Sequence, residues 1–227
     1  MDRTEMKTER LVERLAAELT PVRRIAPVRT RLAWWLLISV PAAGFVAWAS
    51  GLRPDLVARL ADRSLLVEEG AALLTALVGV YAALCAGLPD QPGWKMWLPM
   101  APMALWFGVL GRQCLDVFLQ MGPEGLSITP DAMCLPAIAL GGLVPAIAIA
   151  MLLRGSGKFR TTGACLCGAL GAAALGATAL RLYHLEDAAI MVIVWQLGSV
   201  ALFSLAAAAI RQIVVANADD RIFRASR

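Results

Sequence analysis

The chain has 227 residues, of which 59% are hydrophobic and only 17% are charged, and its formal net charge is +4. A soluble domain is about a quarter charged and about half apolar. The excess apolar residues form long runs without charge, which are typical of membrane helices and exclude an ordinary soluble domain. The basic residues flank these runs, so they indicate membrane orientation and lipid contact, and we expect no direct nucleic-acid binding.

The first segment, residues 1–31, is charged, and we expect a cytoplasmic amphipathic helix followed by a basic hinge that contains Arg29 and Arg31. Apolar residues recur at three- and four-residue spacing with charges of both signs between them, and Pro21 ends the helix. This narrow stripe suits a groove on a partner protein better than a lipid surface; lying in the membrane interface and staying disordered are the alternatives. The residues expected to bind the partner are Leu11, Val12, Leu15, Leu19, Pro21, Val22, Arg23 and Arg24.

The middle of the chain, residues 32–210, is predicted to form an all-α, polytopic membrane domain of six transmembrane helices. Each apolar run has about the 20 residues that a helix needs to cross about 30 Å of hydrocarbon. The predicted spans are residues 32–50, 65–88, 97–115, 132–153, 161–180 and 188–210. Residues 211–227 then form a cytoplasmic C-terminal tail.

The distribution of Lys and Arg predicts the orientation. Sixteen of these 21 residues lie in the two termini and in the two loops that six spans place on the same side. The positive-inside rule puts this side in the cytoplasm. We therefore expect a multi-pass protein of the bacterial inner membrane with both termini cytoplasmic.

The interiors of the predicted spans contain no ionisable side chain, which argues against a transporter. Glu68, Glu69, Arg112 and Asp116 fall at span ends, and we expect them at the level of the lipid headgroups. The chain also lacks the common catalytic motifs. We therefore expect no enzyme activity and no cofactor.

Small residues recur every fourth position in the fifth predicted span, at Ala164, Gly168, Ala172 and Gly176. Such a ladder lets helix backbones approach closely. We interpret it first as packing inside the bundle. A homo-oligomer through this face is the alternative.

Two cysteines and the only histidine are expected on the outer side. Cys114 and Cys134 are predicted at the two ends of the loop between the third and fourth spans, and His184 lies in the loop after the fifth. An oxidising periplasm permits a disulfide, and thiolates with imidazole bind soft metals. The site could therefore respond to oxidants or to a metal, hold a structural disulfide, or be inert.

The sequence resembles a known family in two regions. The tail "LVERLAAELTPVRRIAPVRTRLAWWL" and the later run "CLPAIALGGLVPAIAIAMLLRGSGKFRTTGACLCGALGAAALGATALRLYH" are similar to the NrsF-like six-span membrane anti-sigma factors. Shared features are a cysteine that opens the fourth span, Pro145 within it, a short basic loop and a Gly/Ala-rich fifth span. The segment "VIVWQLGSVAL" resembles the sixth span of the family.

The resemblance implies that the tail holds an extracytoplasmic-function sigma factor at the membrane. It also implies that outer-face cysteines respond to oxidants or heavy metals and control release. Cys134 matches the first family cysteine, but the chain has Leu185 after His184 where the family has its second. Either Cys114 replaces the missing partner, or Cys134 and His184 bind a metal, or the stimulus differs. The alternative function is a membrane redox or metal-binding protein that uses Cys114, Cys134 and His184.

Overall fold

The computed structural model describes most of the region between residues 25 and 184 and short pieces on either side. The described residues are 10, 12–13, 16–17, 25–59, 61–122, 124, 134–154, 160–184, 193–194, 198, 201–202, 204–206 and 209–210. Within them the structure is helical, without a strand. The all-α prediction is therefore confirmed for the described part of the chain.

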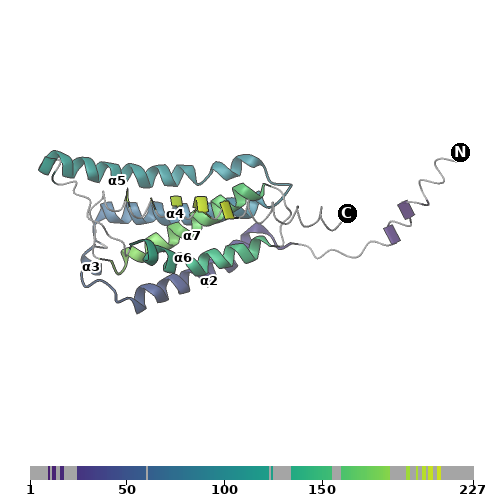
Figure 1. Cartoon of the computed structure of the whole chain (residues 1–227), viewed down its shortest axis with the longest axis horizontal. Coiled ribbons are helices and arrows are strands. Elements are labelled where there is room, and N and C mark those ends of the chain that lie inside the picture. The colour runs from purple at the N-terminus through teal and green to yellow at the C-terminus, as the bar shows by residue number, and fades with distance from the viewer. Residues whose placement is uncertain are drawn as a thin grey trace.

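Among the described residues, five long helices lie side by side (Figure 1). They are α2 (Val28–Ala49), α4 (Arg63–Ala86), α5 (Met100–Met121), α6 (Cys134–Leu153) and α7 (Thr161–Arg181). The short α3 (Leu56–Arg59) and the 3₁₀ helix η1 (Gly93–Trp97) lie in the connections. Helix α7 packs between α4 and α6, while α5 packs on α4 and α2 packs on α6.

The bundle has two ends, which we name by their position relative to the N-terminal tail. The tail end is the end at which α2 begins, together with the last residues of α4 and α6 and the first residues of α7. The distal end is the opposite one, with α3, the first residues of α4 and the last residues of α5 and α7 (Figure 1).

Local signals account for several helix boundaries. The side chain of Asp62 accepts a hydrogen bond of 2.9 Å from the backbone N–H of Ser64 and so caps the start of α4. Pro27 precedes α2, and Gly122 follows α5 with a φ of +69°, a conformation that glycine adopts without strain. The boundaries predicted near Pro27 and Asp62 are accurate to a few positions, whereas the predicted end of the helix before Gly122 is six positions short.

Close backbone contact holds α7 against its two neighbours. A Cβ atom at Gly171 would lie 2.8 Å from the carbonyl oxygen of Ala76 on α4. One at Gly176 would lie 2.6 Å from the carbonyl oxygen of Ile138 on α6. Small residues thus permit this packing. The predicted role of the small-residue ladder inside the bundle is confirmed at Gly176, which is one of its members.

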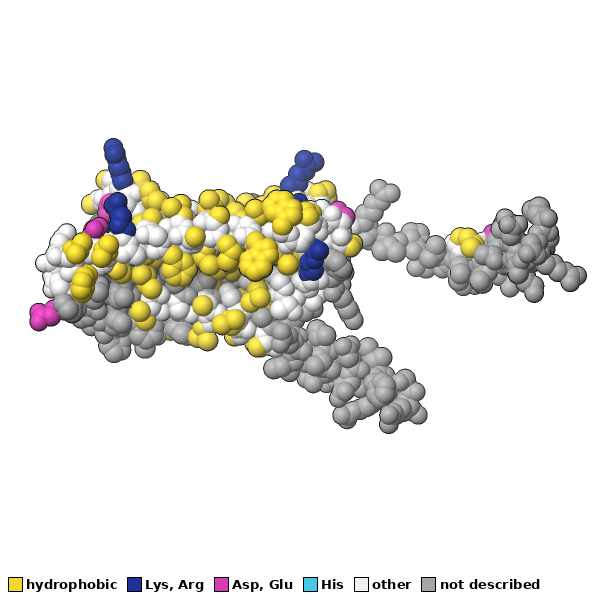
Figure 2. Space-filling model, turned by 90° about the horizontal axis from the view of Figure 1, so that it is seen from above, with side chains coloured by type: hydrophobic (Ala, Val, Ile, Leu, Met, Phe, Trp, Pro, Cys, Tyr) yellow, Lys and Arg dark blue, Asp and Glu magenta, His cyan; other side chains and the backbone are white. Residues whose placement is uncertain are grey.

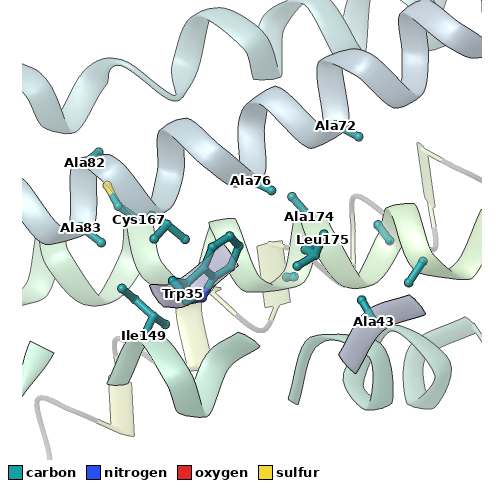
Figure 3. Close-up of a cluster of buried hydrophobic side chains, with 14 of the residues drawn as sticks. Trp35, Ala43, Ala72, Ala76, Ala82, Ala83, Ile149, Cys167, Ala174 and Leu175 are labelled. Atoms are coloured by element: carbon teal, nitrogen blue, oxygen red, sulfur yellow. The ribbon is translucent and has the colours of Figure 1, made fainter. Parts of the chain in front are cut away.

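The core lies along this central helix. Buried alanines of α4 and α7 surround Ile149 of α6 and Trp35 of α2 (Figure 3). The indole N–H of Trp35 donates a hydrogen bond of 3.0 Å to the carbonyl of Pro145, so a polar group of α2 is satisfied by α6.

Within the described part of the chain, four helices are long and apolar enough to cross a membrane, and they are compatible with a membrane protein. They are Val28–Ala49, Arg63–Ala86, Pro136–Leu153 and Thr161–Arg181. Figure 2 shows hydrophobic side chains over the middle of the bundle, with Lys and Arg gathered toward its two ends. Large apolar side chains such as Trp34, Phe45 and Leu105 are exposed on the long helices.

Two predicted spans differ from the structure or lie outside it. The third was predicted at residues 97–115, but Trp97 belongs to η1 and α5 extends from Met100 to Met121. Helix α5 is not among the four apolar helices, because its second half carries Arg112 and Asp116. The sixth predicted span, 188–210, falls mostly outside the described residues, so the number of spans stays a prediction.

The basic hinge was predicted to extend to residue 31, and this is wrong at its end. Helix α2 begins at Val28, so Arg29 and Arg31 belong to the helix. Arg31 is buried, and its Nη2 donates a hydrogen bond to the main-chain carbonyl of Leu152, near the end of α6. The last carbonyls of a helix lack intrahelical donors, so a guanidinium is a suitable partner for them.

Candidate functional site

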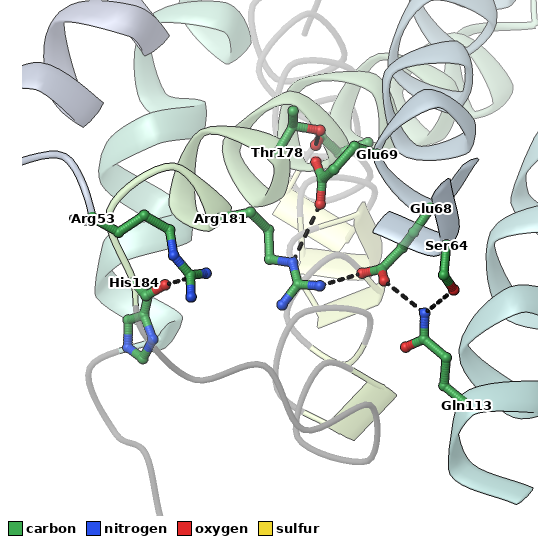
Figure 4. Close-up of polar contacts among 9 residues, drawn as sticks. Arg53, Ser64, Glu68, Glu69, Gln113, Thr178, Arg181 and His184 are labelled. Carbon is green, nitrogen blue, oxygen red and sulfur yellow. Dashed lines mark hydrogen bonds and ion pairs between the residues drawn. The ribbon is translucent and has the colours of Figure 1, made fainter. Parts of the chain in front are cut away.

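An ion-pair cluster joins α4 and α7 at the distal end (Figure 4). Arg181, the last residue of α7, lies 2.9 Å from Glu68 through Nη2 and 3.2 Å from Glu69 through Nε. Glu68 is 1% exposed and Arg181 is 6% exposed, so both charges are removed from solvent. The neighbouring helices thus enclose Glu68, and its expected position at the level of the lipid headgroups stays a prediction.

Gln113 extends this cluster to α5. Its Nε2 donates hydrogen bonds to Oε2 of Glu68 at 3.3 Å and to Oγ of Ser64 at 3.0 Å. Glu68 thus accepts from α5 with one oxygen and from α7 with the other (Figure 4). Three helices meet at one carboxylate.

Because the cluster is buried, its stability depends on each of its charged side chains keeping its partner. Moving charges out of water is costly, and removing one partner of a buried pair leaves the other charge uncompensated. The positions of α4, α5 and α7 at the distal end therefore depend on these particular side chains.

Arg53 ties the loop after α2 to the end of α7. Its Nε and Nη2 lie 2.7 and 2.9 Å from the two carboxylate oxygens of Asp55. Its Nη1 donates a hydrogen bond of 3.2 Å to the carbonyl of His184. The backbone N–H of Arg53 also donates 3.1 Å to the carbonyl of Leu182. The hydrogen bonds from Arg53 lower the pKa of the Asp55 carboxyl below its ordinary value.

The histidine expected to take part in sensing lies in this region. His184 is three residues after Arg181, and its backbone N–H donates 2.9 Å to the carbonyl of Leu180. Its side chain is half-buried. A ligand that moved His184 would therefore act on a segment already bonded to Arg53 and directly connected to Arg181.

The two candidate sensing cysteines lie on different helices. Cys114 was predicted at a loop end, but it lies inside α5, two turns before Met121, as a half-buried free thiol. Cys134 is the first residue of α6, one turn before Ile138, which packs on Leu180 near the distal end. Only the backbone of Cys134 is described.

Helices α4 and α7 lie between α5 and α6 (Figure 1), so the structure does not place Cys114 and Cys134 on adjoining helices. Within the described part of the chain, no group of three or more His, Cys, Asp or Glu residues could hold a metal ion. The metal site of Cys134 and His184 and the pairing of the cysteines stay predictions.

Of the predicted partner-binding residues, only Val12 is described. It is helical and 60% exposed, and its described neighbours Arg10 and Glu13 are also helical and exposed (Figure 1). The other predicted partner-binding residues lie outside the described part: Leu11, Leu15, Leu19, Pro21, Val22, Arg23 and Arg24.

Sequence reasoning missed the roles of Arg53, Gln113 and Arg181. The available signal was a pair of adjacent carboxylates, Glu68 and Glu69, near the start of one apolar run and an arginine at the end of another. Charges at matching depth on antiparallel helices can pair, but only if the two helices are neighbours. Neither apolar run predicts which other helix it packs against.

Comparison with known proteins assigns the chain to a family. No curated protein and no solved structure matches the chain. Residues 15–216 match the family NrsF, described as negative regulator of sigma F. This region includes every described long helix and most of the predicted partner-binding residues. The chain therefore belongs to the NrsF family, and this membership, which confirms the resemblance seen in the sequence, implies negative regulation of a sigma factor.

Proposed function

We propose that the protein is a membrane-bound anti-sigma factor for an extracytoplasmic-function sigma factor. Its N-terminal helix sequesters the sigma factor in the cytoplasm, and an oxidant or heavy metal at the outer face triggers release. Cys134, Cys114 and His184 are the sensing residues in this proposal, with Cys134 and His184 as the ligands where the stimulus is a metal. The family match over residues 15–216 is the observation that carries it.

The tail supports the binding role by its pattern. Val12 is exposed on a helical segment, between the charged residues Arg10 and Glu13, which are also exposed. A stripe of Leu and Val with charges of both signs suits a groove on another protein. The helix is too short to be stable alone in water, so it gains its structure on the partner.

The bundle supports a transmitting role by the way α7 connects its two ends. At 21 residues, α7 is about 31 Å long. Arg181 lies in the distal cluster, and Arg160, immediately before α7, donates a 3.0 Å hydrogen bond to the carbonyl of Gln91 at the tail end. A shift of α7 therefore acts on both ends. A stimulus controls release only if α7 has two positions and the stimulus favours one of them.

The binding role is tested by co-purification of sigma factors with the full-length protein and with a version that lacks residues 1–24. We expect the truncated protein to lose the sigma factor because the binding stripe is removed. The variant Arg112→Met, at an exposed distal position, is the matched control and should retain it. Equal recovery from the full-length and truncated proteins would show that the tail is not the binding element.

The sensing role is tested by transcription from the sigma-factor target promoters under peroxide or cadmium. Cys134→Ser should abolish induction, whereas Cys85→Ala, at a buried position near the tail end of α4, should leave it intact. Cys114→Ser and His184→Ala then distinguish a disulfide from a metal site. An unchanged response in Cys134→Ser removes this residue from the mechanism.

A further inference from the structure

A second cluster of side chains lies at the tail end, and it is centred on Gln91. The Oε1 of Gln91 accepts a hydrogen bond of 2.6 Å from Nζ of Lys95, and its Nε2 donates 2.9 Å to Asp90. Its main-chain carbonyl accepts from Nη1 of Arg160 at 3.0 Å. The loop that follows α4 is thus bonded to the residue that precedes α7.

Beside this cluster lies a cavity of about 520 Å³, which we name the tail-root pocket. One wall is formed by residues 25–29, the segment that leads from the tail into α2. The other wall is formed by Tyr81, Leu88, Asp90 and Gln91, at the end of α4 and in the following loop. The pocket therefore lies where the tail joins the bundle.

The surroundings of the pocket are basic. Arg29 lines the pocket and is exposed, and Arg160, also exposed, bonds to the carbonyl of Gln91. Nζ of Lys95 lies 5.6 Å from the centre of the Tyr81 ring. Asp90 is the acidic residue that lines the pocket. This surface favours a partner that presents acidic side chains.

The length of the tether brings a tail-bound protein onto this surface. The predicted partner-binding residues end at Arg24, four residues before α2 begins at Val28. Four extended residues reach at most about 14 Å. A domain of about 100 residues has a radius of gyration of about 13 Å, so a partner bound up to Arg24 meets the end of the bundle.

We propose that the tail-root pocket and the basic residues beside it, Arg29, Lys95 and Arg160, form a second contact surface for the tail-bound sigma factor. This surface engages an acidic patch of that protein. This inference rests on the proposed function. The tail tethers the partner, while the pocket, built from α2 and α4 and linked through Gln91 to α7, makes affinity depend on the arrangement of the bundle. A movement of α4 or α7 then weakens binding without any change in the tail.

The test measures binding of the co-purified sigma factor to full-length protein in nanodiscs of phosphatidylcholine. Arg29→Glu reverses an exposed charge beside the pocket, and we expect it to weaken binding at least about tenfold. The matched control is Arg112→Glu, an exposed charge at the distal end, which should bind like the unmodified protein. Circular dichroism verifies that both variants keep their helices.

A third variant separates the two proposals. Leu15→Glu disrupts the apolar stripe of the tail. If this variant loses binding of the sigma factor, the result supports the proposed function independently of the pocket. If Leu15→Glu loses binding while Arg29→Glu binds normally, the second contact surface is overturned and the tail proposal stands. If Leu15→Glu binds normally, the tail proposal itself fails.

Anionic lipid is the competing occupant of a basic surface. The same measurements are therefore repeated with phosphatidylglycerol in the nanodiscs. If Arg29→Glu weakens sigma-factor binding in nanodiscs of phosphatidylcholine, which contain no anionic lipid, the result supports the protein contact. A defect that appears only with phosphatidylglycerol assigns the surface to lipid and overturns the proposal.

Discussion

Each end of the bundle contains a buried arginine, and the contacts described for the two arginines are with different kinds of group. At the distal end, Arg181 lies 2.9 and 3.2 Å from the carboxylates of Glu68 and Glu69. At the tail end, Arg31 donates to the main-chain carbonyl of Leu152. Ion pairs require particular side chains, whereas a carbonyl is present at the end of any helix.

This difference indicates how the two ends respond to movement. The distal cluster connects three helices through one carboxylate, so its members move together or separate at a large cost. The tail-end contacts of Arg31 and Arg160 with carbonyls depend on where helix ends and loops lie. A shift along α6 therefore changes the contact of Arg31 at the tail end, whereas a shift along α7 acts on the contact of Arg160 and on the distal cluster together.

The largest expected effect is at the distal cluster. Arg181→Met leaves two carboxylates without their cation, and the free energy of unfolding should fall by about 3–5 kcal/mol. Unfolding by sodium dodecyl sulfate, followed by circular dichroism, measures this change. Arg112→Met at an exposed position is the control. A loss below about 1 kcal/mol would contradict the assigned role of the ion pairs.

A smaller effect is expected at the tail-end arginine. Arg31→Met removes a charged donor from the end of α6 and should lower the free energy of unfolding by about 1.5–3 kcal/mol. Arg29→Met, on the exposed side of the same helix turn, should have little effect. If Arg31→Met costs as much as Arg181→Met in the same assay, the contrast between the two ends is wrong.

The close packing between α4 and α7 is tested at Gly171. A Cβ there would lie 2.8 Å from the backbone oxygen of Ala76, so Gly171→Ala forces the two helices apart and should cost about 1–3 kcal/mol. Gly44→Ala is the matched control, because no atom lies within 4 Å of its new Cβ. Equal stability of the two variants would show that α7 moves freely against α4.

The smallest expected effect is a pH dependence at Asp55. Because Arg53 lowers the pKa of this carboxyl, its contribution to stability is complete above the unfolded pKa of about 3.9 and is lost as pH falls through the lower folded value. Asp55→Asn should therefore reduce the melting temperature at neutral pH, and the difference from the unmodified protein should shrink below pH 4. A difference that is constant with pH would exclude this origin.

The apolar helices could be predicted from the sequence with errors of a few residues. Helices α4 and α7 were expected at residues 65–88 and 161–180, and they lie at Arg63–Ala86 and Thr161–Arg181. The error is larger at α5, which was expected to end at residue 115 and continues to Met121. Polar residues such as Arg112 and Asp116 end an apolar run, but they do not end a helix.

The candidate site could be predicted only in part. His184 lies beside the distal cluster, just after α7, as its predicted position after the fifth span implies, but its contact with Arg53 involves a main-chain carbonyl that no residue type reveals. Gln113 joins Glu68 because α5 packs on α4. Such contacts between residues 45 or more positions apart depend on helix order around the bundle, which hydropathy does not encode.

The sequence by itself therefore determined the helical class, the apolar runs, the small residues that permit close packing and the family of the protein. These are properties of local composition and spacing, and they do not change with the arrangement of neighbours. Only the tertiary structure decided that Arg181 pairs with Glu68 and Glu69, that α4 and α7 separate Cys114 from Cys134, and that Arg31 bonds to the end of α6. The physical reason is that a buried charge is stable only where another helix brings a partner to it.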